Sequence, residues 1–286
     1  MKKVMILNPA AGHGDAAKIS EKDHHIETYL TRSVGDAERF ACERCKSEAE
    51  THFIVCGGDG TVNEVVNGIM KSGAADTAAF SVVPTGSGND FVRLHLEKGL
   101  KHRIDLIKYN ERYAVNMLNI GFDSRVVEKT DKYKNKHKGS TAYLMGVADA
   151  FFHKLTESFK VKYITMDGEK VECAGEYVLC ALANGKYCGG GFNFAPLSSV
   201  TDGILDLLLI HKVSRIKFLT IFGEFRKGAF IDEEGNIKGK FKKIIDYVKC
   251  RSVKIENTTT VCADGEVEHP ESVNAEICHD AINFIS

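Results

Sequence analysis

The sequence predicts an α/β N-terminal domain with a three-layer parallel sheet, followed by a mostly antiparallel β-sandwich C-terminal domain. Two observations carry this prediction. In the first third of the chain, short apolar runs that stop at asparagine or glycine alternate with helix-like segments, as in a parallel sheet covered by helices. After about residue 110 the pattern changes to successive strand-like runs with Asp-Gly turns, which is typical of antiparallel sheet.

The N-terminal domain is predicted to span residues 1–110. Apolar runs bounded by turn residues predict strands at 3–7, 26–30, 53–56 and 80–83. Helices are expected directly after the loop at 10–14, at about 36–50 and at 61–70. The last of these helices has apolar residues spaced i, i+3, i+4 and i+7, the pattern of a helix that packs by one face: Val62, Val65, Val66 and Ile69.

The C-terminal domain is predicted to span residues 111–272. Strands are expected at 113–120, 159–166, 176–183, 204–211, 252–257 and 260–263, and helices at 140–155 and 214–225. The last segment, 273–286, is a candidate for completing the first domain.

Composition excludes several classes of protein. The formal net charge of -1 provides no overall field that would attract nucleic acid. No run approaches the roughly 20 apolar residues that cross a bilayer, and the N-terminus lacks a signal-peptide pattern. Nine scattered cysteines fit reduced thiols, and the Cys42–Cys45 pair lacks the second pair that a zinc site needs. We therefore expect a cytoplasmic protein that touches a membrane without spanning it.

The strongest motif is the run FIVCGGDGTVNE at 53–64, a strand that enters glycines and then opens an amphipathic helix. Glycines allow backbone amides to approach phosphate oxygens, and a helix N-terminus adds unpaired N–H groups and a favourable dipole. The motif therefore predicts a site for a di- or triphosphate. The structural alternative is a tight turn in which the glycines serve geometry alone and Thr61 is an N-cap.

Two further loops follow predicted parallel strands, at 8–14 and at 83–91 (VPTGSGNDF). Ligands of such sheets bind in the crevice outside the carboxyl ends of the strands. All three loops should therefore face one cleft.

The stretches NPAAGHG, GGDGTVNEVVNGI, PTGSGNDFVR, TDGILDL and ADGE occur in this order along nearly the whole chain. With them the sequence resembles the diacylglycerol kinase catalytic family, which also includes sphingosine kinases and bacterial lipid kinases. The resemblance implies an NAD-kinase-like fold and ATP-dependent phosphorylation of a lipid hydroxyl, with diacylglycerol as the first candidate. Phosphatidylglycerol, a sphingoid base and a prenol remain open as acceptors.

The resemblance also implies which residues contact ATP and magnesium. The residues expected at the nucleotide are Asn8, Pro9, Ala10, Ala11, Gly12, Thr31, Gly58, Asp59, Gly60, Thr61, Val62, Asn63, Glu64 and Ser87. Thr31 rests on the short match T-x-x-x-G-D-A, and a plain strand-end threonine is an equal alternative. Asp59, Asp90 and Asp105 are expected to be linked through water to a magnesium ion, because clustered carboxylates repel one another without a cation.

Asp264-Gly265-Glu266 resembles the catalytic base motif of the family. Phosphoryl transfer needs a carboxylate that accepts the proton of the acceptor hydroxyl, and the sequence does not choose between Asp264 and Glu266. The alternative is an Asp-Gly hairpin turn with a solvent-facing glutamate.

A loop that holds a structural cation in bacterial lipid kinases has its counterpart in the run SVTDGI. By resemblance its ligands are Ser199, Asp202 and Ile204. A plain Asp-Gly turn is nearly as good an interpretation.

The run EKTDKYKNKHK at 128–138 is basic and leads into an apolar stretch at 142–152. Such a pairing suits an anionic lipid surface, whereas the alternative is a solvated loop beside a core helix. We expect a lipid substrate at the membrane surface and peripheral membrane contact, and we leave a homodimer open.

Parts of the sequence also fit three other functions. NAD kinases resemble this sequence around GGDGT, but the continuation VNEVVNG and the 84–91 block are typical of the lipid group. A dinucleotide-binding oxidoreductase is suggested by G-x-G-x-x-A at 12–17, which lies beyond the strand end and lacks the acidic residue about 20 positions on. A non-catalytic nucleotide-binding regulator is disfavoured by the intact aspartates and Glu266.

Overall fold

The structure is a computed structural model that describes residues 1–11, 26–85, 89–93, 96–134, 140–153 and 155–286. It divides into two compact units. The first comprises Met1–Leu106, Val200–Gly203 and Cys278–Ser286, and the second comprises Ile107–Ser199 and Ile204–Ile277. The sequence boundary at residue 110 thus lies a few residues beyond the boundary between units, and only the end of the 273–286 segment belongs to the first unit.

The first unit is built on a parallel sheet. Its strands are β1 (Lys2–Leu7), β2 (Glu27–Leu30), β3 (Thr51–Gly57) and β4 (Ala79–Pro84), in the order β2-β1-β3-β4. Beyond β4, the end of β16 (Ser272–Ile285) adds a further parallel pairing through Asn283 and Phe284. The apolar residues of β1 are buried in this sheet, whereas β2 is an edge strand whose Leu30 is 54% exposed.

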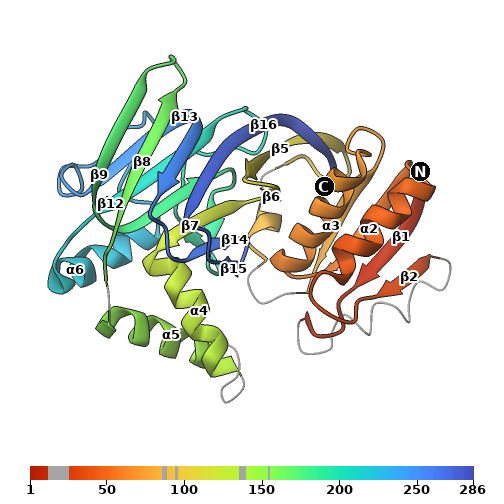
Figure 1. The fold of residues 1–286 in the computed structure, drawn as a ribbon, viewed down its shortest axis with the longest axis horizontal. Helices are drawn as coiled ribbons and strands as arrows, with labels where there is room; N and C mark the ends of the chain where they lie inside the picture. Colours follow the sequence, from red (N-terminus) through yellow and green to blue (C-terminus); the bar gives the residue numbers. More distant parts are fainter. Residues whose placement is uncertain (12–25, 86–88, 94–95, 135–139, 154) are drawn as a thin grey trace. The chain divides into compact units, whose positions relative to one another are not determined.

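Helices α2 (Asp36–Ser47) and α3 (Asp59–Ser72) pack side by side over this sheet (Figure 1). Their contact requires a glycine, since a Cβ at Gly68 would lie 2.4 Å from the backbone oxygen of Glu38 and 2.8 Å from Cβ of Ala41. Close backbone approach therefore fixes how α3 lies on α2. The helix expected in the loop after β1 falls on residues outside the described ranges.

The second unit is an antiparallel β structure with three helices. Its sheet order is β15-β14-β7-β9-β12-β13-β16. The strands are β6 (Arg112–Ala114), β7 (Met117–Gly121), β8 (Glu157–Thr165), β9 (Lys170–Ala183), β10 (Tyr187–Cys188), β11 (Phe192–Asn193), β12 (Leu205–His211), β13 (Ile245–Glu256), β14 (Val261–Ala263) and β15 (Glu266–Glu268). The helices are α4 (Phe122–Lys134), α5 (Ser140–His153) and α6 (Arg215–Arg226). Strand β5 (Lys101–Tyr109) runs from the first unit into the second.

Long strands that change partners give this unit its sandwich character. The first half of β9 pairs with β8, and its second half pairs with β7 and β12. Alternate residues of the buried strands belong to two separate cores: Leu207 and Leu209 lie in one, and Leu208 and Ile210 lie in the other. The second of these cores also receives the apolar faces of α4 and α6. The predicted fold class is therefore confirmed.

Several element predictions were wrong in detail. The single strand expected at 113–120 is two strands, β6 and β7, which pair with different partners. The helix expected to reach residue 50 ends at Ser47. The basic run at 128–138, for which the alternative was a solvated loop, begins inside α4. The 83–91 loop ends in the 3-10 turn η2 (Phe91–Arg93).

Within the described residues, no helix is long and apolar enough to cross a membrane.

Candidate functional site

The N-terminus of α3 is the centre of the site in the first unit. Gly58 takes an extended conformation at the N-cap position, and within the described part of the chain no side chain caps the helix there. Because the first N–H groups of a helix have no intrahelical partner, this end offers donors and a positive dipole to an anion. Gly57 lets the chain reach that position, since a Cβ on it would lie 2.6 Å from the Cβ of Thr61.

The end of β1 is fastened to the same helix. The side-chain amide of Asn8 donates to the hydroxyl of Thr61 at 3.1 Å, and its oxygen accepts the N–H of Ala10 at 3.0 Å. Pro9, Ala10 and Ala11 follow β1 in this turn. The loop after β1 and the start of α3 are therefore held together, as the parallel strand order predicts.

The ends of β2 and β4 flank these two elements. The backbone N–H of Thr31 donates to the oxygen of Leu7 at 3.0 Å, and that of Thr85 donates to the oxygen of Gly57 at 3.4 Å. The buried hydroxyl of Thr85 has no hydrogen-bond partner among the described residues. A buried hydroxyl without a partner next to an uncapped helix end fits the oxygen-rich phosphate tail of a nucleotide.

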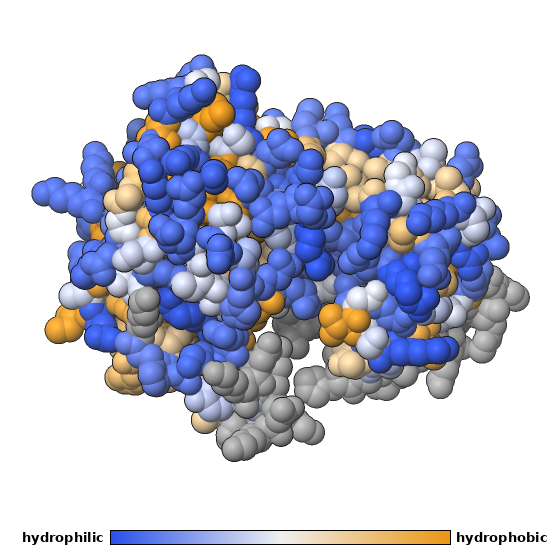
Figure 2. Space-filling model, in the orientation of Figure 1, coloured by the Kyte–Doolittle hydropathy of each residue, from blue (hydrophilic) through white to orange (hydrophobic). Residues whose placement is uncertain are grey.

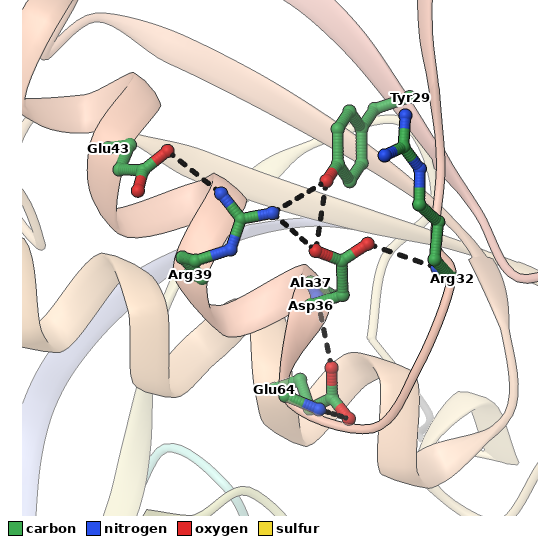
Figure 3. A network of polar contacts seen from close by, with 8 residues as sticks. Tyr29, Arg32, Asp36, Ala37, Arg39, Glu43 and Glu64 are labelled. Atoms are coloured by element: carbon green, nitrogen blue, oxygen red, sulfur yellow. Dashed lines mark hydrogen bonds and ion pairs between the residues drawn. The ribbon is translucent and has the colours of Figure 1, made fainter.

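The carboxylate of Glu64 contacts the start of the neighbouring helix α2 (Figure 3). Its two carboxylate oxygens accept the N–H of Gly35 at 2.8 Å and the N–H of Ala37 at 3.1 Å, so this α3 side chain caps the first turn of α2. The capped loop begins at Thr31. Glu64 therefore positions the loop that carries Thr31 and has no carboxylate oxygen left without a protein donor.

Asp36 anchors the other side of the same loop (Figure 3). Burial opposes its ionisation, but hydrogen bonds from Arg39, from the Tyr29 hydroxyl and from the N–H of Arg32 outweigh that effect and hold the pKa of the carboxyl below its ordinary 3.8. Tyr29 also stacks on Phe40 with ring centroids 3.8 Å apart. The loop is thus fixed by one carboxylate from each helix.

Asp59 and Asp90 meet at the start of η2. The carboxylate of Asp59 accepts the backbone N–H groups of Asp90 and Phe91, each at 3.3 Å. Asp90 is 6% exposed and its carboxylate lies 3.4 Å from Nε of Arg93. These contacts join the glycine motif to the PTGSGND motif.

Asp105 lies in a different set of contacts. It is fully buried, and its carboxylate accepts the N–H of Gly203 at 2.7 Å, the N–H of Asp280 at 2.8 Å and a contact of 2.8 Å from Nδ1 of His279. Asp105 and the side chains of His279 and Asp280 form a group whose ligand atoms lie within 4.8 Å of one another. No such group joins Asp105 to Asp59 and Asp90 among the described residues.

His279 and Asp280 were missed by the sequence analysis, because no spacing connects them to Asp105 from the far end of the chain. The Asp105 carboxylate raises the pKa of His279 above its ordinary 6.5, first through their hydrogen bond and then through their charges. The contacts of the Asp105 carboxylate therefore join β5, the Val200–Gly203 segment and β16 within the first unit.

The Asp264-Gly265 pair forms a two-residue hairpin turn between β14 and β15, with Ala263 opposite Glu266. Both turn residues have positive φ, 49° for Asp264 and 93° for Gly265, as a type I′ turn requires. The hairpin alternative raised from the sequence therefore describes the backbone correctly. A hairpin turn is compatible with a catalytic role, because the turn places Asp264 and Glu266 in different environments.

The Asp264 carboxylate is turned inward and is 8% exposed. It accepts the backbone N–H groups of Val115 at 2.6 Å, Asn116 at 3.0 Å and Met117 at 2.9 Å, at the corner between β6 and β7. These three bonds occupy both carboxylate oxygens. Glu266, by contrast, is half-buried, and it is the more exposed of the two acids.

Beside Glu266, a second acid of β15 is tied into the sheet. Glu268 accepts the Tyr109 hydroxyl at 3.1 Å and lies 3.5 Å from Nε of Arg112. Burial, with a smaller effect of Glu268, raises the pKa of Tyr109 well above its ordinary value. Tyr109 is therefore a neutral donor that fixes Glu268.

Other expected residues fall as follows. Val62 and Asn63 are buried in the first turns of α3, and Asp59, Gly60 and Thr61 form its start. Gly12 and Ser87 lie outside the described residues. Asp202 stands in the Val200–Gly203 segment of the first unit, whereas Ser199 and Ile204 belong to the second.

The expected membrane segment is described only in part. Lys129 lies 3.5 Å from the Asp149 carboxylate, which also accepts the Tyr133 hydroxyl at 3.0 Å. These contacts hold α4 against α5. The remaining lysines of the run, at 132–138, lie outside the residues whose side chains are described.

Comparison with known proteins covers both units. Residues 2–120 match the family model "Diacylglycerol kinase catalytic domain", and residues 116–286 match "YegS C-terminal NAD kinase beta sandwich-like domain". A curated relative from Chromohalobacter salexigens, named "Probable lipid kinase YegS-like", is 29% identical over 284 residues, 93% of this chain and 85% of the relative. One of the same name from Alcanivorax borkumensis is 29% identical over 198 residues, 65% of this chain and 64% of the relative.

Solved structures agree with this fold. A structure from Bacillus anthracis strain Sterne, described as a candidate diacylglycerol kinase, has a TM-score of 0.71 at 27% identity and covers 99% of this chain and 96% of its own. An α/β unit with an uncapped helix after a glycine turn, continued by a β-sandwich with an acidic hairpin, defines a kinase of the NAD-kinase-like architecture. The chain belongs to the diacylglycerol kinase catalytic family.

Proposed function

We propose that the protein is an ATP-dependent lipid kinase that transfers the γ-phosphate to a lipid hydroxyl, with diacylglycerol as the first candidate acceptor and phosphatidic acid as its product. Family membership and the lipid kinase name of its curated relatives support this proposal. The single observation that carries it is the uncapped start of α3 after the turn at Gly57 and Gly58.

In this proposal the phosphate tail of ATP lies against Gly58–Glu64. Backbone N–H groups of the first turn of α3 bind its oxygens, and the Thr85 hydroxyl is placed beside them. Asn8, held by Thr61, lines the opposite side together with the turn that follows it. Glu64 and Asp36 also hold the loop of Thr31 in place.

Magnesium, when bound, neutralises charge on the transferring phosphoryl group. Asp59 and Asp90 are proposed for this role, because the Asp59 carboxylate accepts the backbone N–H of Asp90 and so brings the two acidic residues together. Asp105 would act in the same network through water. The ligands proposed for a structural cation remain Ser199, Asp202 and the carbonyl of Ile204.

Glu266 is the proposed general base. Its half-buried carboxylate is placed by a tight turn, and proton removal from a hydroxyl requires an accessible carboxylate oxygen. Asp264 has a different task in this proposal: its three N–H contacts hold the hairpin against β7 and so position Glu266.

The proposal is tested by incubating the full chain with radiolabelled ATP, magnesium and a panel of acceptors in mixed micelles. The panel contains diacylglycerol, phosphatidylglycerol, a sphingoid base and a long-chain prenol, with NAD in solution as the rival acceptor. Transfer of the label to one of the lipids by the wild type, and its loss in the Glu266→Gln variant, supports the proposal. Label in NAD alone, or transfer that Glu266→Gln leaves intact, contradicts it.

A further inference from the structure

Exposed apolar side chains gather at one corner of the second unit. Phe152 at the end of α5 is 74% exposed, and Ile216 and Leu219 on α6 are 78% and 61% exposed. Figure 2 shows apolar atoms at the left edge of the molecule, where Figure 1 draws α6. We call these three residues the α5–α6 corner. Contiguous exposed apolar groups mark interaction surfaces more often than scattered ones do.

The α5–α6 corner is held in place by hydrogen bonds and by ring contacts. Arg215, the first residue of α6, donates from Nε to the backbone oxygen of Phe151 at 3.1 Å and from Nη2 to that of His153 at 3.1 Å. It therefore caps the last carbonyls of α5. The Phe151 ring lies 5.4 Å from that of Phe152 and 6.0 Å from that of Phe218, so the end of α5 is packed onto α6.

The apolar residues of the corner are not needed by the core. Helix α6 already buries Phe218, Ile221 and Phe225, spaced i, i+3 and i+7, on its inner face. Ile216 and Leu219 lie three apart on the other side of the helix and point to solvent. A helix that is apolar on a second, solvent-facing side has a surface that folding of the unit leaves uncovered.

The surroundings of the corner are cationic. Between residues 213 and 227 the sequence contains four cations, Arg215, Lys217, Arg226 and Lys227, and the single acid Glu224, whereas the preceding Lys212 is paired with Glu176. Glu224 is already paired with Lys240. Apolar side chains beside cations match a bilayer that contains anionic lipid, in which the apolar groups enter the interface and the cations meet the headgroups.

We propose that the α5–α6 corner is the docking surface through which the protein binds an anionic membrane. This inference rests on the proposed function, since a lipid acceptor resides in a bilayer. A second copy of the chain fits less well: a symmetric interface would bring the same cations face to face, and three side chains cover far less than the roughly 1,200 Å² of a stable interface. The surface lies beside the stretch singled out in the sequence, but it is centred on α6.

The test is sedimentation of the full chain with phosphatidylcholine vesicles, with and without phosphatidylglycerol. The variants Phe152→Ser, Ile216→Ser and Leu219→Ser remove the apolar groups. Each should weaken vesicle binding about 10-fold, because the variant loses the free energy of transferring one apolar side chain from water into the bilayer. Lys217→Gln should weaken binding to anionic vesicles about 5-fold, and high salt should abolish that difference.

A matched control is Val34→Ser, which removes an apolar side chain that is 84% exposed in the first unit. It should bind vesicles as the wild type does. Equal vesicle binding by the corner variants and this control would overturn the proposal. So would a wild type that ignores anionic vesicles, or a dimer in analytical ultracentrifugation that Ile216→Ser dissociates.

Kinase assays separate this inference from the proposed function. On diacylglycerol in vesicles the corner variants should be slow, and on short-chain diacylglycerol dispersed in solution they should match the wild type. If the wild type phosphorylates no lipid yet binds vesicles through the corner, the function fails and the docking surface stands. If it phosphorylates vesicle lipid and the corner variants keep pace, the docking surface fails and the function stands.

Discussion

The carboxylate of Asp264 accepts the backbone N–H of Met117 at 2.9 Å, and this contact separates the roles of two acids that stand two positions apart in the chain. Both carboxylate oxygens of Asp264 accept backbone N–H groups at the corner between β6 and β7. Glu266, across the turn, is the more exposed of the two acids. An acid that holds structure and an acid that moves a proton should respond differently to loss of charge.

Glu266→Gln should lower kcat by about 100-fold or more, because the amide does not accept the hydroxyl proton. The melting temperature and the affinity for ATP should stay near those of the wild type. Steady-state kinetics and a thermal melt of the same preparation check both. Turnover close to that of the wild type would remove Glu266 from the chemistry.

Asp264→Asn should instead destabilise the protein by about 2 kcal/mol, since the amide replaces a charged acceptor of three N–H bonds and turns a donor toward them. Denaturant unfolding measures the loss. A kcat decrease is expected only to the extent that the hairpin is displaced. An unchanged free energy of unfolding would show that the three contacts do not hold the turn.

Glu64→Ala should lower the free energy of unfolding by about 1–2 kcal/mol, the usual effect of losing a helix cap, and should raise the KM for ATP. The reason is that Gly35 and Ala37 lose their acceptor, and the loop that begins at Thr31 loses its anchor. The matched control is Glu43→Ala, a 63% exposed partner of Arg39 on the surface of α2, which should cost less than about 0.5 kcal/mol. Equal effects of the two substitutions would contradict the capping role.

Gly68→Ala should destabilise the first unit by about 1–3 kcal/mol, because the new Cβ would press on the backbone oxygen of Glu38. Gly223→Ala on α6 is the control: nothing lies within 4 Å of its Cβ position. That substitution should stabilise its helix by about 0.5–1 kcal/mol. Thermal melts of both variants should move in opposite directions, and a shift of the same sign would count against the packing described for α2 and α3.

The low pKa of Asp36 predicts how acid affects the first unit. A carboxyl whose pKa is lower in the folded than in the unfolded chain stabilises the fold at pH values above its ordinary 3.8, and this contribution is lost as pH falls through the folded pKa. Asp36→Asn should therefore be less stable than the wild type at neutral pH, and the difference should shrink in acid. Melting temperatures across pH measure it, with Asp167→Asn, at an exposed turn, as the control. A difference that does not vary with pH would contradict the assignment.

The parts of the fold that the sequence predicts are those encoded over short stretches. The glycine turn at Gly57, the amphipathic face of α3 and the Asp-Gly turn at Asp264 each depend on neighbours within a few residues, so their patterns are visible in the chain. Helix α4 was missed because Phe122–Lys134 is rich in charge and carries no clear apolar stripe.

The parts that could not be predicted depend on partners far along the chain. Asp105 meets His279 only because β5 and β16 are brought together by folding, and no local pattern marks that pair. Likewise the choice between Asp264 and Glu266 depends on which acid faces the backbone of Met117. The cap that Glu64 forms on α2 has the same cause, since Gly35 and Ala37 lie far from it in the chain.

Binding of ATP at the start of α3 is the claim on which the kinase assignment depends, and it is tested most directly by calorimetric titration of ATP with magnesium into the wild type and Gly60→Val. The added side chain stands in the first turn of the helix, where phosphate oxygens would lie, so affinity should fall about 100-fold or more while the melting temperature shows a folded protein. Gly239→Val, at an open surface position of the second unit, should bind ATP normally. A folded Gly60→Val protein that binds ATP as tightly as the wild type would contradict the account.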